Sequence, residues 1–156
     1  MTKQVIGIGT TADDGTGDQL RTAFNKTNLN FTEVYLNTTA SVGATWVGAG
    51  GVVSTPINDV FVLMPIAGTI TKVTILTVGG SGSCSIDIYK GTYAAYPPSA
   101  SIVASAPPAI SAGIKYQDAT LTGWTTAIAA GDILGFHLTS SSTFTIVNVI
   151  LTISHT

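Results

Sequence analysis

The stretches "DILGFHLTS" (132–140) and "TFTIVNVILTIS" (143–154) decide the fold of this chain. In the first, Leu134, Phe136 and Leu138 alternate with Ile133, Gly135 and His137, and a period of two is typical of a strand with one face on a core. We expect the first three in the core. The second stretch is apolar on both faces, so it needs a second cover, supplied by a helix or another subunit. Its two faces carry Val147, Val149, Leu151 and Ile153, and Phe144, Ile146 and Ile150.

Other stretches rich in β-branched residues and bounded by turn signals also predict strands. They are "VFVLM" (60–64), "TITKVTILTV" (69–78) and "CSIDIYK" (84–90), with shorter or edge strands in "SIVAS" (101–105) and "YQDATLTGW" (116–124). Within 84–90 we expect Cys84, Ile86 and Ile88 to face the core and Ser85, Asp87 and Tyr89 to face outward. Seven or eight strands without an intervening helix indicate a mainly β fold, an antiparallel β-sandwich or jelly roll of two sheets over residues 52–156.

The composition supports a β-rich body and excludes several functions. Charged residues are 9% of the 156, against roughly 25% in an average soluble domain. The polar surface must come largely from 25 threonines, with serines and glycines, which suits strands and turns. The net charge is −2 and the 6 Lys and Arg form no run, which argues against direct nucleic-acid binding.

Membrane insertion and export are not indicated. The long uncharged stretches contain proline pairs or serine runs that a lipid-facing helix would not carry, and the N-terminus lacks a signal-peptide apolar run. Cys84 is a lone cysteine, so no disulfide is expected within the chain. We expect synthesis in the cytoplasm.

Residues 1–40 differ from the rest of the chain. A glycine-rich loop precedes a helix that we expect to begin at Gln19, with Asp18 as its N-cap. Residues spaced 4, 3, 4 and 3 apart form a heptad-like seam, in which Thr27 is the polar member: Leu20, Phe24, Thr27, Phe31 and Val34. So short a helix is not stable alone, so the seam must pack on the chain's own β-domain, on neighbouring copies or on a partner. Residues 41–51 are small and glycine-rich and predict a linker.

A search for chemistry finds no catalytic or metal-binding constellation. His137 and His155 have no cluster at metal spacing, and "DDGTGD" (13–18) lacks the glutamate that closes an EF-hand loop. Asp87, Asp118 and Asp132 are interpreted as surface turn residues rather than as paired glycosidase carboxylates. We therefore expect no enzyme activity, cofactor or metal.

One loop suggests an alternative function in binding. "GTYAAYPPSA" (91–100) is aromatic and stiffened by proline, and Tyr93 and Tyr96, with Trp124, would be able to stack on a sugar ring. Such loops are usually packed rims of a domain.

The segment "IGTTADDGTGDQLRTAFNKTNLNFTEVY" (8–35) resembles a motif that recurs near the N-termini of tailed-bacteriophage virion proteins, among them tail fibres, tail-tip proteins and head fibres or decorations. Gln19 stands where the motif usually has proline, Thr27 where it has an aliphatic residue and Leu29 where it has an acid. The matching positions are Asp14, Gly15, Thr16, Gly17, Asp18, Leu20, Arg21, Ala23, Phe24, Lys26, Asn28, Asn30, Phe31, Glu33 and Tyr35. The chain from Pro65 almost to its end is also similar to a β-domain common in phage fibre-like proteins.

The resemblance implies a homotrimer in which three helices bundle on the axis, and it supplies no catalytic residue. It implies a virion structural protein, either a short trimeric fibre or spike or a capsid decoration, that contacts other virion proteins of the capsid, tail or baseplate. The alternative is a receptor-binding tail-fibre module that recognises a host surface glycan. The residues expected in oligomerisation or attachment are Asp18, Leu20, Arg21, Phe24, Thr27, Phe31, Val34 and Tyr35.

Overall fold

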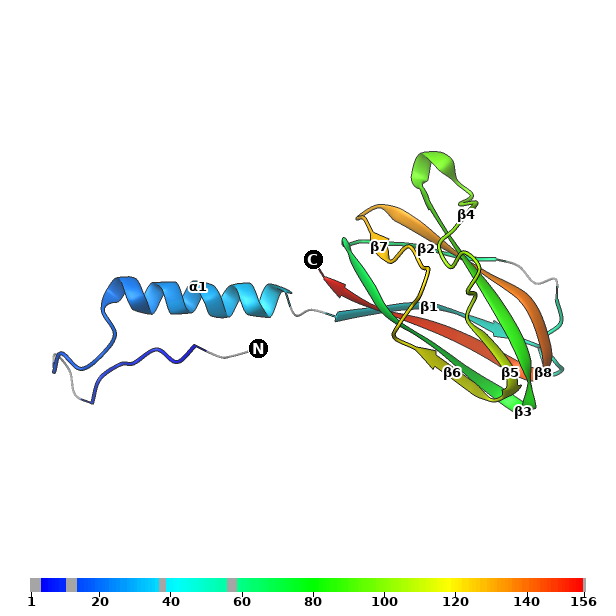
Figure 1. The fold of residues 1–156 in the computed structure, drawn as a ribbon, viewed down its shortest axis with the longest axis horizontal. Helices are drawn as coiled ribbons and strands as arrows, with labels where there is room; N and C mark the ends of the chain where they lie inside the picture. Colours follow the sequence, from blue (N-terminus) through cyan, green and yellow to red (C-terminus); the bar gives the residue numbers. More distant parts are fainter. Residues whose placement is uncertain (1–3, 11–13, 37–38, 56–58, 156) are drawn as a thin grey trace. The chain divides into compact units, whose positions relative to one another are not determined.

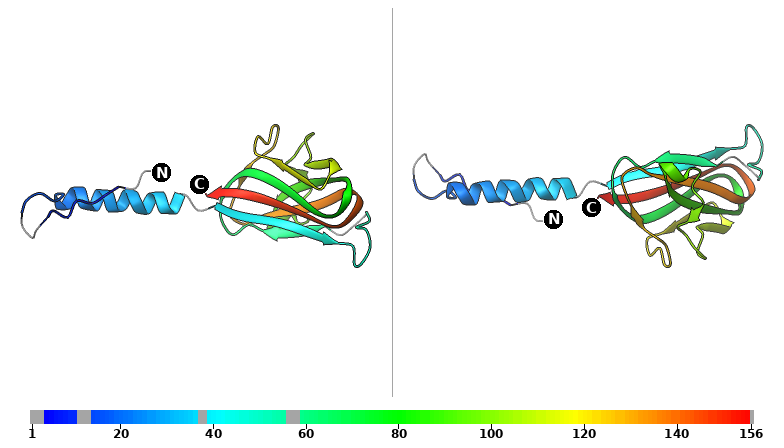
Figure 2. Two further views of the ribbon diagram at one scale, coloured as in Figure 1. Left: turned by 90° about the horizontal axis from the view of Figure 1, so that it is seen from below. Right: turned by 90° about the horizontal axis from the view of Figure 1, so that it is seen from above.

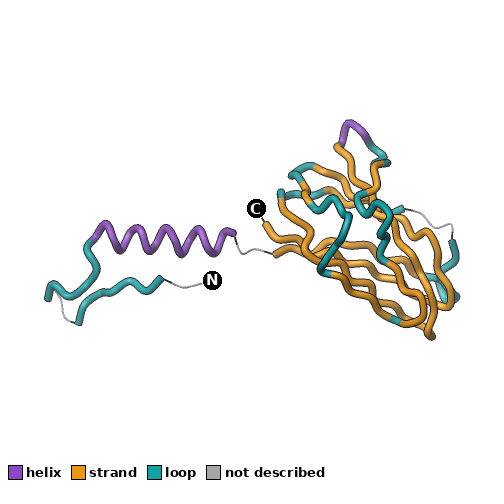
Figure 3. Tube along the Cα trace, viewed as in Figure 1, coloured by secondary structure: helices purple, strands orange, loops and turns teal. Residues whose placement is uncertain are grey.

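The computed structural model describes residues 4–10, 14–36, 39–55 and 59–155 and divides the chain into two compact units (Figure 1). Unit 1 is Met1–Thr38 and holds an extended N-terminal segment, a loop and one helix. Unit 2 is Thr39–Thr156 and holds the strands. In Figure 3 the long helix of unit 1 is purple and the strands of unit 2 are orange, with one short purple turn beside them. The expected mainly β, antiparallel fold with an N-terminal loop and short helix is confirmed.

The elements follow the chain in a simple order. Unit 1 contains helix α1 (Leu20–Leu36). Unit 2 contains β1 (Thr39–Val47), β2 (Val60–Leu63), β3 (Gly68–Thr92), the short 3₁₀ turn η1 (Tyr93–Ala95), β4 (Ala100–Ser101), β5 (Ala109–Gly113), β6 (Lys115–Asp118), β7 (Ala127–Ile128) and β8 (Asp132–His155). The edge strands predicted over 101–105 and 116–124 are wrong over most of their length: β4 reaches only the first residue of 101–105, and β6 covers only residues 116–118 of the second stretch.

Two long antiparallel strands, β3 and β8, form the frame of unit 2. They pair along their whole length, from Gly68 opposite His155 to Thr92 opposite Asp132. β1 and β2 add to β8, while β4, β5, β6 and β7 add to β3, so the described strands form one continuous sheet. The two predicted sheets are therefore two halves of one sheet, which folds over a single core (Figures 1 and 2).

The fold-over occurs where the sequence predicts a break. The register of β3 against β8 shifts between Val78 and Ser83, through the glycine-rich stretch that we expected to be a turn between strands. Gly79 there has a φ of +133°, which L side chains rarely adopt. The glycines let β3 and β8 bend together. The strands predicted over 69–78 and 84–90 are therefore one strand, β3, and those over 132–140 and 143–154 are one strand, β8.

The core faces agree with the alternation in the sequence. Leu134, Phe136 and Leu138 are buried, as are Cys84, Ile86 and Ile88 from the facing strand, which confirms both predictions. The prediction that Phe144 and Val147 lie on different faces of the strand is wrong, because both are buried in the core. An extra residue in β8 at the register shift, where Val78 pairs with Ile146 but Gly79 pairs with Phe144, turns Phe144 into the core.

The linker predicted over residues 41–51 is wrong over most of its length, because β1 occupies Thr39–Val47 and pairs with β8 residue for residue. Ala44 and Trp46 are buried and Val42 packs against the core, so the strand has the alternation of a core strand. Gly43 lies so close to β8 that a side chain there would collide with the carbonyl oxygen of Val149. The β-domain therefore begins at Thr39 rather than at residue 52.

This placement of β1 predicts a large loss of stability for one substitution and almost none for its neighbour. Trp46→Ala should lower the free energy of unfolding by about 3–5 kcal/mol, because it removes a large buried side chain and leaves a cavity. Val47→Ala is the matched control, since Val47 is 58% exposed on the other face, and should change it by no more than about 0.5 kcal/mol. Urea denaturation measures both. Equal midpoints for wild type and Trp46→Ala would show that β1 adds nothing to the core.

Candidate functional site

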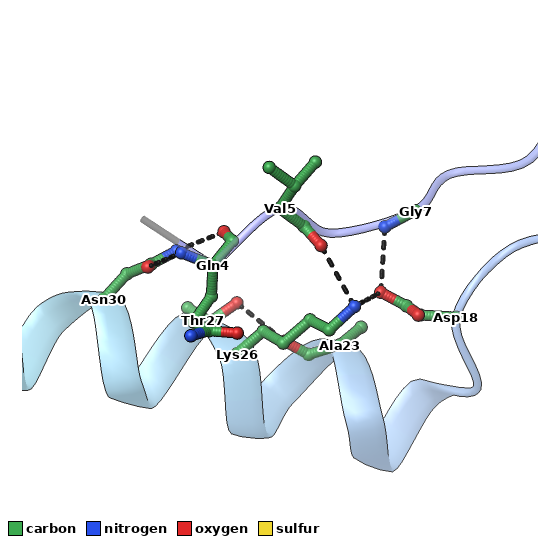
Figure 4. Close-up of polar contacts among 8 residues, drawn as sticks. All are labelled: Gln4, Val5, Gly7, Asp18, Ala23, Lys26, Thr27 and Asn30. Atoms are coloured by element: carbon green, nitrogen blue, oxygen red, sulfur yellow. Dashed lines mark hydrogen bonds and ion pairs between the residues drawn. The ribbon is translucent and has the colours of Figure 1, made fainter. Parts of the chain in front are cut away.

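The N-terminal segment runs back along helix α1 and is held there by polar side chains of the helix. The backbone of Gln4 makes a reciprocal pair with the Asn30 amide: Gln4 N donates to Oδ1 at 2.9 Å, and Nδ2 donates to Gln4 O at 3.0 Å. Figure 4 shows this pair and the contacts of Lys26, whose Nζ donates to the carbonyl oxygen of Val5 at 3.0 Å. Because both contacts use backbone atoms of the segment, they fix its position along the helix.

Asp18, which lies in the loop before the helix, connects the N-terminal segment to the helix. Its Oδ2 accepts hydrogen bonds from Lys26 Nζ at 2.7 Å and from Gly7 N at 2.8 Å, and its own backbone N donates to Gly7 O at 2.8 Å. The hydrogen bond from Lys26, and after it the one from Gly7, holds the pKa of the Asp18 carboxyl below its usual value. The structure thus corrects the predicted N-cap role: α1 begins at Leu20, and the carboxylate holds the N-terminal segment.

The loop before the helix is organised by the Asp14 carboxylate. Oδ2 accepts from the backbone N and Oγ1 of Thr10, both at 2.7 Å, and Oδ1 accepts from Thr16 N at 2.9 Å and Thr16 Oγ1 at 2.8 Å. Gly9 and Gly15 have φ values of +77° and +69°, which glycine adopts without strain. The aspartate, threonine and glycine of the motif therefore have a local folding role, while Asp13 lies outside the described residues.

The seam of α1 is exposed within unit 1. The exposed fractions are 73% for Leu20, 60% for Phe24, 69% for Phe31 and 69% for Val34. Thr27 is half-buried and its Oγ1 donates to the carbonyl oxygen of Ala23 at 3.0 Å, so its polar group is satisfied within the helix. Arg21 is exposed, and the side chain of Tyr35 lies outside the described residues.

A shallow groove follows this seam. It has a volume of about 230 Å³ and is lined by Ile6 of the N-terminal segment and by Thr27, Asn30, Phe31 and Val34 of the helix. The seam and the docked segment thus form one largely apolar surface. The sequence predicted the helix side of this surface, but not the docked segment, because nothing in its pattern pairs Gln4 with Asn30.

The three aromatic residues expected to bind a glycan have different surroundings. Tyr93 lies in η1 and is 83% exposed. Tyr96 packs edge-on against Phe61 of β2, with ring centroids 5.1 Å apart. Trp124 is half-buried against the core, and its Nε1 donates to the carbonyl oxygen of Ala106 at 3.0 Å. The described contacts of Trp124 are thus with the core and with Ala106, whereas Tyr93 and Tyr96 both lie between β3 and β4.

Two of the three aspartates considered for catalysis lie at strand ends beside turns: Asp118 is the last residue of β6 and Asp132 the first of β8, where it is buried rather than on the surface as expected. Oδ1 of Asp118 accepts from the backbone N and Oγ1 of Thr120, both at 2.8 Å, and the backbone hydrogen bond is the main reason why its pKa is lowered. Oδ2 of Asp132 accepts from Ala129 N at 2.8 Å and lies 3.9 Å from Lys90 Nζ. Asp87 instead belongs to a cluster that the sequence did not reveal, in which His137 contacts Asp59.

The described residues contain no group of three or more His, Cys, Asp or Glu side chains placed to hold a metal ion. Among the same residues, no helix is long and apolar enough to cross a membrane.

Comparison with known proteins gives little. No family model and no curated protein matches the sequence. Among solved structures, the chain is similar to a novel carbohydrate binding module from glycoside hydrolase family 9 (Cel9A) from Ruminococcus flavefaciens FD-1, with 13% sequence identity and a TM-score of 0.42 over 75% of this chain and 97% of that one. Similarity at this level does not indicate what the present chain binds.

The contacts of Asp18 predict a pH dependence for unit 1. The folded pKa lies below the usual value of 3.8, so the stabilisation is fully present above pH 3.8 and is lost as the pH falls through the lower folded pKa. We expect the Gly7 amide to be protected from hydrogen exchange at neutral pH and to lose that protection in acid. NMR exchange measurements across this range test the expectation.

Two variants make this test specific. Asp18→Asn should leave the Gly7 amide poorly protected at every pH, because a neutral amide holds Lys26 less strongly. Asp118→Asn is the control, since it removes a carboxylate whose pKa is also lowered but which lies in unit 2. If the Gly7 amide of Asp18→Asn still loses its exchange protection in acid, the protection does not depend on the Asp18 carboxylate and the prediction is wrong.

Proposed function

We propose that this chain is a structural component of a tailed-phage virion, a short trimeric fibre, spike or capsid decoration, and that α1 makes the trimer. The supporting observation is that the polar residues of the N-terminal motif bind within their own unit while its apolar residues face solvent. Asp14, Asp18, Lys26 and Asn30 hold the loop and the docked segment. Leu20, Phe24 and Phe31 are more than half exposed.

An exposed apolar seam on so short a helix calls for a cover. Burial of a Leu or Phe side chain contributes about 1.5–3 kcal/mol, and a helix of 17 residues is marginal in water without tertiary packing. The 4, 3, 4 and 3 spacing suits copies of the same helix, because it keeps one stripe toward the axis of a bundle. Thr27 fits such an axis, since its hydroxyl already donates to Ala23 and would not be buried unpaired.

The docked segment would make the trimer more specific. It covers one flank of each helix through hydrogen bonds to Asn30 and Lys26, so neighbouring helices cannot pack on that flank, whereas the seam and its groove stay open to them. The N-terminal loop and Arg21 would then be available to contact other virion proteins, in the capsid or in the tail and baseplate. In this proposal the protein is made in the host cytoplasm, acts in the virion and carries out no catalysis.

The seam is tested by the oligomeric state. Phe24→Asp combined with Phe31→Asp should convert a trimer into a monomer, because three copies would bring six carboxylates together on one axis. Leu29→Asp is the matched control: it places a carboxylate on an exposed apolar position of the same helix outside the seam, and should leave the trimer intact. Sedimentation velocity of the full chain at micromolar concentration distinguishes these states.

Deletion of residues 1–36 should also give a monomer with a folded β-domain, and it should detach the protein from virions that carry it. A wild-type chain that sediments as a monomer would contradict the trimer, as would a Phe24→Asp, Phe31→Asp variant that remains trimeric.

A further inference from the structure

The outer face of unit 2 carries a cluster of aromatic and polar side chains that the sequence did not predict as a site. Gly135 of β8 pairs with Phe61 of β2 on one side and with Tyr89 of β3 on the other. Residues directly opposite each other in antiparallel strands point to the same face, so Phe61 and Tyr89 flank a position that has no side chain. One step along the same face, His137 lies opposite Asp87.

The polar side chains of this face are held by one another. His137 Nδ1 lies 2.5 Å from Asp59 Oδ1, and the His137 ring meets the Tyr89 ring edge-on with centroids 6.4 Å apart. Burial, and after it a hydrogen bond with Asp87, raises the pKa of the Tyr89 hydroxyl. Asp59 thus contacts the histidine and Asp87 the tyrosine of a Tyr–His pair whose rings pack against each other.

Asp87 is fixed from a further strand. Its Oδ1 accepts from Ser101 Oγ of β4 at 2.7 Å and from the backbone N of Ile88 at 2.8 Å. Because the Ser101 hydroxyl donates to Asp87 rather than to His137, the cluster does not have the geometry of a serine nucleophile activated by histidine.

The loop after η1 completes the aromatic part of this face. Pro98 lies over the glycine positions, since side-chain atoms at Gly135 or Gly91 would approach its ring to 3.1 Å. The loop brings Tyr96 edge-on against Phe61, at an interplanar angle of 68°, and Tyr96 remains 55% exposed. An exposed ring held in place by a neighbouring ring offers a flat apolar surface at low entropic cost.

We propose that this outer strip, formed by Phe61, Tyr89, Tyr96, Asp59, Asp87 and His137, binds a neutral sugar. Aromatic faces pack against the C–H groups of a pyranose ring, and carboxylate and imidazole groups hydrogen-bond to its hydroxyls. Two carboxylates on one strip repel an acidic sugar, so we do not expect an anionic ligand. A few fixed polar groups beside an apolar surface are also the usual composition of a small-molecule site.

This inference goes beyond the proposed structural role and does not depend on it. The strip lies wholly in unit 2, whereas the trimer seam lies in unit 1. The affinity of each strip should therefore be the same in the trimer and in the monomeric Phe24→Asp, Phe31→Asp variant, so the two proposals can fail separately.

The test uses the full chain labelled with ¹⁵N and titrated with methyl glucoside, methyl galactoside and neutral oligosaccharides built from them. We expect amide shift changes at Tyr89, His137 and Tyr96 with at least one of these sugars. Tyr96→Ala should weaken the affinity about tenfold, the order expected for the loss of one aromatic contact. Asp87→Asn should weaken it as well, because it alters the hydrogen bonds to Tyr89 and Ser101.

Tyr93→Ala is the matched control, since Tyr93 lies on the same loop, is more exposed than Tyr96 and is outside the strip. It should leave the affinity unchanged. The proposal would be overturned by a flat titration with every neutral sugar, by binding that survives Tyr96→Ala and Asp87→Asn in folded protein, or by preference for an acidic sugar such as sialic acid.

Discussion

The pairing of β3 with β8 is the constraint on which unit 2 depends. β3 and β8 each run through both halves of the sheet. A bend in one of them therefore requires a bend in the other at the paired position. The remaining strands of the described residues all pair with one of these two, and all except the nine-residue β1 are short. One continuous ladder thus determines the core face, the outer face and the places where glycine is needed, and it also brings Asp87 opposite His137.

The sequence predicted those parts of the fold that alternate with a period of two. Leu134, Phe136 and Leu138 could be placed in the core because polar or small residues separate them, and the structure buries all three. The strand β1 was missed although it alternates in the same way, because one of its core residues is Ala44, whose small side chain gives a weak apolar signal. Glycine there reflects close contact with β8 rather than a flexible linker.

The candidate sites were predictable to different degrees. The seam of α1 follows from spacing along one helix, so Leu20, Phe24 and Phe31 could be named without a structure. The docked N-terminal segment could not, because its hydrogen bonds to Asn30 and Lys26 use backbone atoms that any sequence would offer. The outer strip could not be named either. Asp59 and His137 are 78 positions apart, and only the register of β2 and β8 brings them together.

The charged residues are distributed unevenly because only one of the two units, as far as the structure describes them, has a hydrophobic core. Residues 1–35 carry seven of the fourteen charged side chains, and Asp18 and Lys26 among them hold a unit too small to have a core of its own. Unit 2 has a core and needs few charges for stability.

Three copies joined through α1 would carry three outer strips, so a surface with many sugars could be held by several weak contacts at once. Low affinity at each strip would then be compatible with firm attachment, because the second and third contacts form at a high effective concentration.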